Sequence, residues 1–298
     1  MSLVLVLAAA LAAAQPAAQQ ETFATPDQAA QALIAAAGTF DVAALTKILG
    51  PDGVDLVVTK DSVQDKHQAS AFAEMAKART RVVKDSKNPK TATIIVGPDD
   101  WPGPIPIVER NGRWSFDTKA GRQELLYRRI GRNELDAIEV CQGFGEAQHD
   151  YASERHDGAT INQYAQHIIS TPGKHDGLAW KTADGTWGGP VGEGIARVIA
   201  EGYSSKYEPY HGYYFRVLKG QGPSAPMGAL DYVVEGAMIG GFALAATPAD
   251  YGVTGIKSFI VNQDGIVYEK DLGPKSVEQF KAMTIYNPDK TWTVVKED

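Results

Sequence analysis

Aromatic side chains concentrate in one Gly- and Pro-rich stretch in the second half of the sequence. The set includes Trp187, Tyr207, Tyr210, His211 and Tyr213. Such residues are favoured in contact surfaces, because they bury a large area at a small loss of conformational entropy. We therefore predict that they form a surface for an envelope protein or a glycan. The alternative is that they only anchor loops onto a sheet, since neighbouring strand residues point to opposite faces.

The histidines do not have the spacing of a metal site. None falls in an H-E-x-x-H pattern or beside a pair of cysteines, so we predict no metal and no cofactor. One alternative remains, because His149, Asp150, His156 and Asp157 are close in sequence and would become ligands if the chain folds back there. The sequence also lacks a G-x-S-x-G elbow and a phosphate-binding loop, so no catalytic residue is assigned.

Cys141 is the single cysteine, which excludes a disulfide within the chain. It belongs to a helical pattern that places close to one face the side chains of Leu135, Ile138, Phe144 and Tyr151. We predict that the thiol is buried and packs as a small apolar group. The alternative is a reactive nucleophile.

Charge excludes one class of partner. The chain has 29 basic and 36 acidic residues, a net charge of -7 and a pI near 5.4, which argues against nucleic-acid binding. A local basic cluster contains Arg122, Arg128, Arg129 and Arg132. We interpret it as a face that pairs with acids or solvent, and an anion that bridges two halves of the molecule is the alternative.

The first half has the pattern of helices followed by a sheet. Thr25 forms a capping box ahead of Pro26, Asp41 is placed to cap a second helix, and Asp61 or Ser62 is placed to begin a third. Residues 93–96 and 105–108 then form predicted strands, and Asn111-Gly112 predicts a tight hairpin turn. Helices that precede an antiparallel sheet indicate an α+β arrangement.

Acids near these strands are candidates for acid-base chemistry. They are Asp99, Asp100 and Asp117. Each lies beside Pro, Trp or a turn, so we interpret them as solvated turn residues. A catalytic carboxylate in the first half is the alternative.

The second half has a long helical pattern followed by strands. One helix is predicted over residues 119–130, and Gly131 separates it from a second helix that Asn133 caps and that runs to about Glu154. Loops rich in Gly and Pro follow. Strands are then predicted over residues 213–218, 240–246, 258–261 and 266–268.

The first residues have the composition of a secretion signal. An apolar run over residues 3–14 ends in small residues and is too short to span a bilayer. No Lys or Arg precedes it, so a later start or an uncleaved anchor is an alternative, as is a buried helix. We predict a signal peptide over residues 1–20, a periplasmic or secreted protein, and no membrane span in the mature chain.

Three resemblances extend this interpretation. The segment "TPDQAAQALIAAAGTFDVAALTKIL" with "PIPIVERNGRWSFD" resembles NTF2-like folds, and "NELDAIEVCQGFGEAQHDYASER" with "PADYGVTGIKSFIVNQDGIVY" resembles the heads of type IV pilins and pseudopilins. Across most of the chain, "RRIGRNELDAIEVC", "STPGKHDGLAW" and "PYHGYYFRVL" resemble the secreted bacterial family DUF 2950. That family implies an envelope setting and no assigned activity.

Together these patterns predict an α+β protein with two domains. An NTF2-like domain of helices and a curved antiparallel sheet would occupy residues 21–130, and a pilin-head-like domain with a long helix on an antiparallel sheet would occupy residues 131–298. We expect a binding or assembly module of the cell envelope. The alternative is a periplasmic hydrolase or isomerase with its site in the N-terminal cone or in a cleft between the domains.

Overall fold

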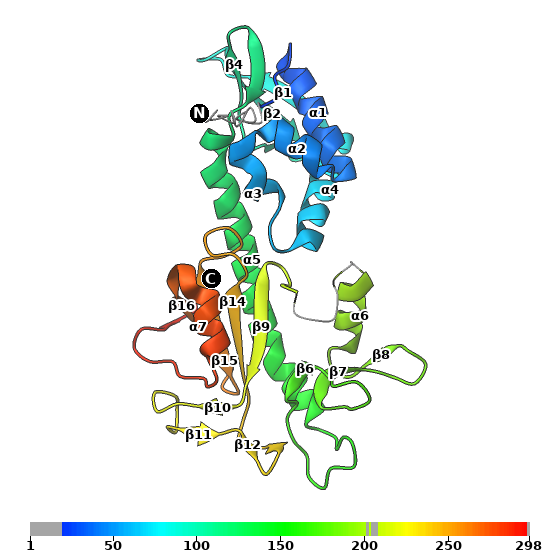
Figure 1. The fold of residues 1–298 in the computed structure, drawn as a ribbon, viewed down its shortest axis with the longest axis vertical. Helices are drawn as coiled ribbons and strands as arrows, with labels where there is room; N and C mark the ends of the chain where they lie inside the picture. Colours follow the sequence, from blue (N-terminus) through cyan, green and yellow to red (C-terminus); the bar gives the residue numbers. More distant parts are fainter. Residues whose placement is uncertain (1–19, 201–202, 204–207, 297–298) are drawn as a thin grey trace, which may run out of the picture.

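The protein is an elongated α+β molecule, which confirms the predicted fold class (Figure 1). The structure, a computed structural model, describes residues 20–200, 203 and 208–296. Residues 1–19 of the predicted signal peptide and Tyr207 lie outside the described residues. Within the described part, no helix has both the length and the apolar character that crossing a bilayer requires.

The first part of the chain forms a helical layer and a small sheet. Its helices are α1 (Pro26–Thr39), α2 (Val42–Leu49), the 3-10 turn η1 (Pro51–Gly53), α3 (Val54–Val57) and α4 (Ser62–Ala78). Its strands are β1 (Thr80–Lys84), β2 (Thr91–Val96), β3 (Trp101–Pro102), β4 (Ile107–Arg110) and β5 (Arg113–Phe116). The strands are antiparallel in the order β1-β2-β4-β5, and β3 also pairs with β2.

Local signals in the sequence fix the ends of these elements as predicted. Thr25, Asp41 and Asp61 each accept a hydrogen bond from a backbone N–H in the first turn of α1, α2 and α4. Asn111 and Gly112 join β4 to β5 with positive φ angles of 54° and 74°, as a tight hairpin turn requires. Apolar side chains of α1, α2 and α4 pack on the inner face of the sheet in one cluster.

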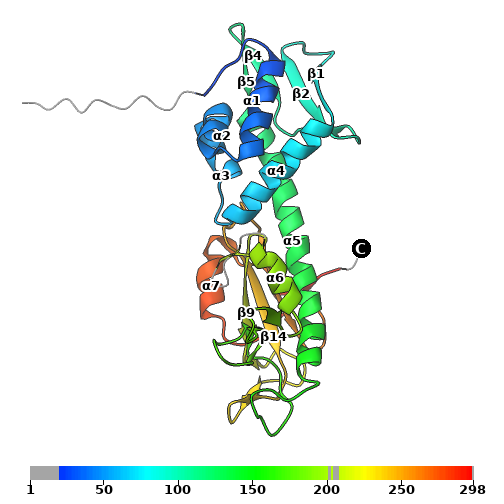
Figure 2. The ribbon, with the colours of Figure 1, turned by 90° about the vertical axis from the view of Figure 1, so that its right-hand side faces the viewer.

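A single helix, α5 (Thr118–Tyr151), continues from this sheet into the second part of the chain (Figure 2). The predicted helix break at Gly131 is therefore wrong, while the domain boundary between residues 130 and 131 stays a prediction. A glycine in a helix costs only about 1 kcal/mol, and tertiary packing overrides that preference here. Gly121 on the first half of α5 lies against the backbone of Ile105, and Ala137 on the second half packs in the other cluster.

The buried stripe of α5 also differs from the predicted one. Ile130, Asn133, Ala137, Cys141 and Phe144 are buried and recur at intervals of three and four residues. Leu135, which we expected on this face, is 68% exposed. Asn133 takes a core-facing position two residues before Leu135, so a helix of 3.6 residues per turn directs Leu135 to the opposite side.

The second part of the chain builds a larger sheet with two small ones. Its helices are α6 (Gly192–Ala200), the 3-10 turn η2 (Gly273–Lys275) and α7 (Ser276–Ala282). The main sheet contains, in spatial order, β17 (Thr293–Val294), β16 (Tyr268–Asp271), β15 (Lys257–Asn262), β14 (Ala243–Pro248) and β9 (Tyr213–Leu218). The smaller strands are β6 (His167–Ile169), β7 (Gly177–Lys181), β8 (Trp187–Gly188), β10 (Gly220–Gln221), β11 (Leu230–Asp231), β12 (Val233–Val234) and β13 (Ala237–Met238).

Strand β14 occupies the centre of this part. All six of its residues are buried, although strand side chains alternate between two faces. Figure 2 shows why, since α5 and α7 lie on opposite sides of the main sheet. A second hydrophobic cluster, which includes Cys141, Phe144 and Phe259, forms on this sheet and is separate from the first cluster.

Buried polar side chains join the two parts where α4 meets α5. The Asp61 carboxylate accepts hydrogen bonds from Gln64 N, from the Tyr203 hydroxyl and from Gly212 N at 2.9–3.0 Å. Asn133 accepts from the Gln64 amide at 3.1 Å and donates to the Thr254 carbonyl at 2.8 Å. We call this group the junction network. It connects the first turn of α4 with the middle of α5 and with loops of the second part.

The arginine cluster bonds to protein groups, and two of its four members pair with acids. Arg122 forms an ion pair with Asp55, and Arg128 pairs with Glu124 at 2.7 Å. Arg129 donates to the carbonyls that end α3, and Arg132 donates to the Gln68 side chain. The contacts of Arg122 and Arg129 hold α5 against α3, and that of Arg132 holds it against α4. The Arg128 pair, in contrast, lies within α5.

Candidate functional site

The structure separates the aromatic residues that the sequence grouped together. Trp187 lies in β8, where Lys181 Nζ is 5.2 Å from its ring centre. Tyr210 stacks on His211 with ring centres 4.1 Å apart, and His211 Nδ1 is 2.6 Å from Asp136 of α5. The predicted surface is therefore divided between a hairpin and the region of the junction network.

Tyr213 occupies the core rather than a surface. It is fully buried, and its hydroxyl donates a hydrogen bond to the Lys257 carbonyl at 2.8 Å. Burial raises the pKa of this phenol well above its ordinary value. Tyr213 therefore contributes packing, as the loop-anchoring alternative supposed for part of the set.

A polar cavity lies beyond the end of α5, in the half of the molecule that is farther from the N-terminal sheet. We call it the distal pocket, and its volume is about 660 Å³. It is lined by Tyr151, Asp157, Gln163, Tyr164, Gln166, His167, Gly173, Lys174, Asp176 and Gly236. These residues come from the end of α5, from β6 and its flanking turns, and from the β12–β13 hairpin.

One wall of the distal pocket is the turn over residues 171–176. Hydrogen bonds to the carboxylates of Asp176 and Asp157 hold this turn in place. Asp176 accepts hydrogen bonds from the Thr171 backbone and hydroxyl at 2.8 and 2.9 Å. Asp157 accepts from the backbone N–H of His175 at 2.7 Å and lies 2.7 Å from its ring Nδ1. These bonds hold the pKa of the Asp157 carboxyl below its ordinary value, with the backbone bond as the largest cause. These hydrogen bonds therefore fix the positions of two carboxylates that line the pocket.

Aromatic rings pack beside this wall. Tyr151 stacks on His156 at 4.0 Å between ring centres, and the His175 ring meets Trp180 edge-on at 4.8 Å. The Tyr151 hydroxyl donates to the His175 carbonyl. Burial, together with the carboxylates of Asp157 and Asp176, raises the pKa of Tyr151 to about 12, so it stays a neutral donor near pH 7.

Other polar groups of the distal pocket remain available to a ligand. Gln163 is half-buried and Lys174 is exposed, and the side chains of both make no hydrogen bond or ion pair with the described residues. His167 Nε2 lies 4.0 Å from Asp176, too far for a hydrogen bond. An amide, an ammonium group and an imidazole therefore face one cavity beside tyrosine rings, which suits a ligand with many hydroxyl groups.

The metal alternative for the residues around His149 is not supported by their positions. The His149 ring packs edge-on against Phe242, the His156 ring stacks on Tyr151, and Asp157 pairs with His175. Across the described part of the chain, no three His, Cys, Asp or Glu side chains are grouped so that they could hold a metal ion.

The other predicted candidates do not converge on a site. Asp100 pairs with Arg81 at 2.8 Å, and Asp117 caps α5 and pairs with Arg110, while Asp99 is exposed. Cys141 is fully buried, which confirms the predicted burial, and desolvation raises the pKa of its thiol to about 12. A thiol with this pKa is not ionised near pH 7 and is a poor nucleophile.

Sequence reasoning did not find the distal pocket. The segment "STPGKHDGLAW" contains Lys174 and Asp176, but Pro and Gly made it look like an ordinary turn. Its partners come from other segments, since Asp157 bonds to His175 from 18 residues earlier in the chain and Gly236 belongs to the β12–β13 hairpin. The sequence feature that points to the pocket is the density of polar residues around Pro172 and Gly173.

The fold and the site define an α+β protein with a preorganised polar pocket. Residues 20–295 match the family described as "Protein of unknown function (DUF2950)", and the chain belongs to that family. No curated protein matches the chain, and no solved structure matches it. The resemblances to NTF2-like folds and to pilin heads stay predictions.

Proposed function

We propose that this chain is a secreted or periplasmic binding module that recognises a glycan of the cell envelope in the distal pocket. The observation that carries the proposal is that free Gln163 and Lys174 side chains face a cavity whose wall is fixed by Asp157 and Asp176. A rigid site loses little entropy when it binds a ligand. The mixture of donors, acceptors and tyrosine rings matches the surface of a sugar, which combines hydroxyl groups with apolar ring faces.

Binding is tested by calorimetric titration of the purified mature chain with soluble peptidoglycan fragments and envelope polysaccharides. We expect at least one glycan to bind, and Lys174→Met or Gln163→Leu to weaken binding by about tenfold, or about 1.4 kcal/mol. Lys66→Met is the matched control, because Lys66 is an exposed lysine on α4. The proposal fails if no glycan binds, or if the control weakens binding as much as Lys174→Met.

The envelope location is supported by the apolar leader over residues 3–14. Cell fractionation and mass spectrometry of the N-terminus test it. We expect the mature chain outside the cytoplasm, with an N-terminus close to Glu21. A cytoplasmic chain that retains Met1 would contradict this location.

One observation favours a second candidate function, a hydrolase that acts near the junction network. Asp136 accepts from His211 Nδ1 at 2.6 Å if that nitrogen carries the proton, which leaves Nε2 as a proton acceptor. His211 also has a positive φ of 48°, a strained conformation for a residue other than glycine. Screening with chromogenic esters, amides and glycosides tests this function, which requires an activity that His211→Gln abolishes.

A further inference from the structure

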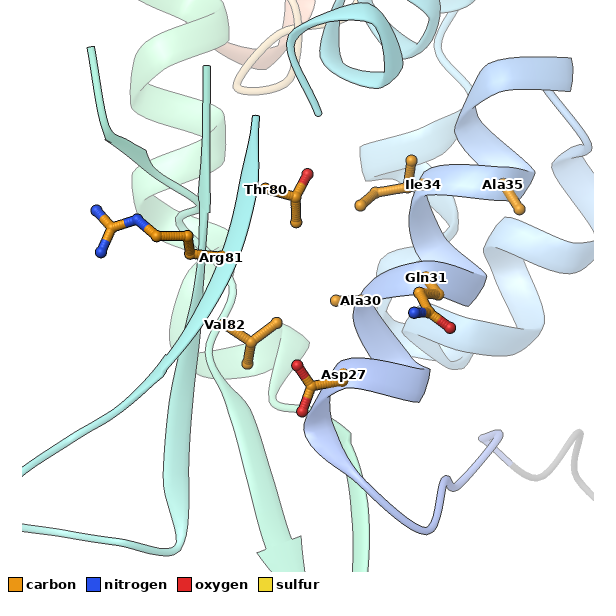
Figure 3. A pocket seen from close by; sticks show the side chains of 8 residues that line it. All are labelled: Asp27, Ala30, Gln31, Ile34, Ala35, Thr80, Arg81 and Val82. Atoms are coloured by element: carbon orange, nitrogen blue, oxygen red, sulfur yellow. The ribbon is translucent and has the colours of Figure 1, made fainter. Parts of the chain in front are cut away.

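A groove runs between α1 and β1 at the end of the molecule opposite the distal pocket. Figure 3 shows α1 on one side and the edge of the sheet on the other. The groove has a volume of about 440 Å³, and its apolar lining includes Ala30 and Ile34 from α1 and Val82 from β1. It is distinct from the site proposed for glycans.

The groove exists because the helical layer ends before the sheet does. Thr80 pairs with Val96 and Val82 pairs with Ile94, so each pair of side chains points to the same face of the sheet. Val96 and Ile94 are buried beneath the helices, at 0% and 2% exposure. In contrast, Thr80 is exposed and Val82 is half-buried. The helices therefore cover this face of β2 fully, but they leave the Thr80 and Val82 side chains of β1 partly accessible to solvent.

The backbone along this edge of the sheet is free to pair. Strand β1 is terminal in its sheet, and among the described residues it pairs with β2 alone. The bonds from Gly97 N to Arg79 O and from Asp85 N to Thr91 O set which β1 residues face β2. By alternation, the N–H and C=O groups of Thr80 and Val82 face away from β2. Such an edge is a template for another strand.

The charge at the groove favours a ligand with a basic side chain. The Asp27 carboxylate points toward Val82 in Figure 3 and makes no ion pair with the part of the chain that is described. Arg81 points away from the groove and pairs with Asp100 at 2.8 Å on the other face of β1. The groove therefore offers one free carboxylate beside an apolar floor.

We propose that an extended peptide segment of a partner protein binds here by adding a strand to β1. Backbone hydrogen bonds to Thr80 and Val82 would supply affinity that does not depend on sequence, and alternate side chains would enter the groove. An apolar side chain fits against Ala30 and Ile34. A Lys or Arg side chain fits beside Asp27.

The test uses short labelled peptides in which Thr alternates with Val, Leu, Lys, Arg or Glu, with binding followed by fluorescence anisotropy. We expect peptides with one apolar and one basic inward residue to bind, and replacement of the basic residue by Glu to weaken binding by about tenfold. Methylation of the peptide nitrogens that face β1 should abolish binding. The proposal is overturned if neither the Glu replacement nor the methylation weakens binding, or if no peptide of the panel binds.

Variants of the protein locate the site. Ala35→Trp fills the groove from an exposed position on α1, and we expect it to weaken binding by about tenfold or more. Ala71→Trp is the matched control on the exposed face of α4 and should leave binding unchanged. The milder Asp27→Asn should weaken only the peptides with a basic residue. Equal effects of Ala35→Trp and Ala71→Trp would overturn the assignment.

Amide hydrogen exchange measured by NMR distinguishes strand addition from simple insertion into the groove. The Thr80 and Val82 amides should exchange more slowly when the peptide is bound, because both become hydrogen-bonded. A peptide that binds without slowing these two amides would contradict the proposed geometry.

Discussion

Cys141 illustrates how environment decides the chemistry of a side chain. A lone thiol in a sequence is a candidate nucleophile, yet this one is 0% exposed and packs in the cluster on the main sheet. Its pKa of about 12 results from desolvation alone. The residue is therefore a small apolar group of the core.

This burial predicts protection from thiol reagents. DTNB should not label Cys141 in the native chain at pH 8, and one thiol per chain should react once guanidinium chloride unfolds it. Cys141→Ser should lower the free energy of unfolding by about 1–3 kcal/mol, because it places a hydroxyl among apolar groups. Rapid labelling of the native chain would show that the thiol is accessible.

Asp157 predicts a dependence of stability on pH. Hydrogen bonds from the His175 backbone and ring lower its pKa in the folded protein, so the ionised carboxylate stabilises the fold at pH values above the ordinary carboxyl pKa. This contribution is lost as the pH falls below about 4 and through the lowered folded-state pKa. The Asp157 side chain is 40% exposed, so solvent screens the effect and keeps it modest.

Urea unfolding at about pH 5 and about pH 3 measures this contribution. Asp157→Asn should lose less stability between the two values than the wild type does. An identical loss in both proteins would mean that the contact with His175 contributes nothing to the pH dependence.

At the scale of elements, two glycines of α5 lie in opposite environments, one tightly packed and one open. A Cβ atom on Gly121 would lie 2.6 Å from the Ile105 Cα and from the Pro104 carbonyl oxygen, whereas nothing lies within 4 Å of a Cβ on Gly131. Gly121 therefore permits close packing of α5 on the chain before β4. Gly131 has no such role.

The two positions form a matched pair on one helix. Gly121→Ala should lower the free energy of unfolding by about 1–3 kcal/mol through overpacking. Gly131→Ala should raise it by about 0.5–1 kcal/mol, because alanine is the better helix former. Thermal and urea unfolding measure both. Destabilisation by Gly131→Ala would argue that α5 bends or breaks at that point.

The sequence predicted the elements whose signals are local. Thr25 and Asp41 cap their helices, and Asn111 forms the hairpin turn, because each needs only its near neighbours. The continuity of α5 through Gly131 was missed, because contacts distant in sequence hold both halves of the helix. The distal pocket was missed for the same reason, since Asp157 and His175 meet only after loops fold together.

At the scale of the whole molecule, the junction network holds the two parts in one arrangement. Asp61 is 2% exposed, caps α4 and also accepts hydrogen bonds from Tyr203 and Gly212 of the second part. Beside it, Lys60 Nζ donates to the Ala249 carbonyl at 2.8 Å. These contacts tie the N-terminal helices to loops beside the main sheet.

Removal of the Asp61 carboxylate therefore affects more than one helix. Asp61→Ala should lower the free energy of unfolding by about 2–4 kcal/mol, because a cap is lost and buried donors are left unpaired. Asp41→Ala is the control, since the exposed Asp41 only caps α2, and it should cost about 1 kcal/mol. Equal losses would show that the bonds to the second part add no stability.

Helix α5 also sets the distance between the two proposed binding sites. Its 34 residues span about 50 Å at 1.5 Å per residue, and the distal pocket and the groove on β1 lie toward opposite ends of the molecule. The two proposed ligands, a glycan and an extended peptide, would therefore bind at opposite ends of the molecule.

Hydrogen exchange of the full mature chain, with and without an envelope glycan that binds it, tests most directly whether the distal pocket is the ligand site. We predict slower exchange over residues 163–176, which supply most of the lining of the pocket, and unchanged exchange in α1 and β1. Protection confined to any other segment, or no protection at saturating glycan, would contradict the account.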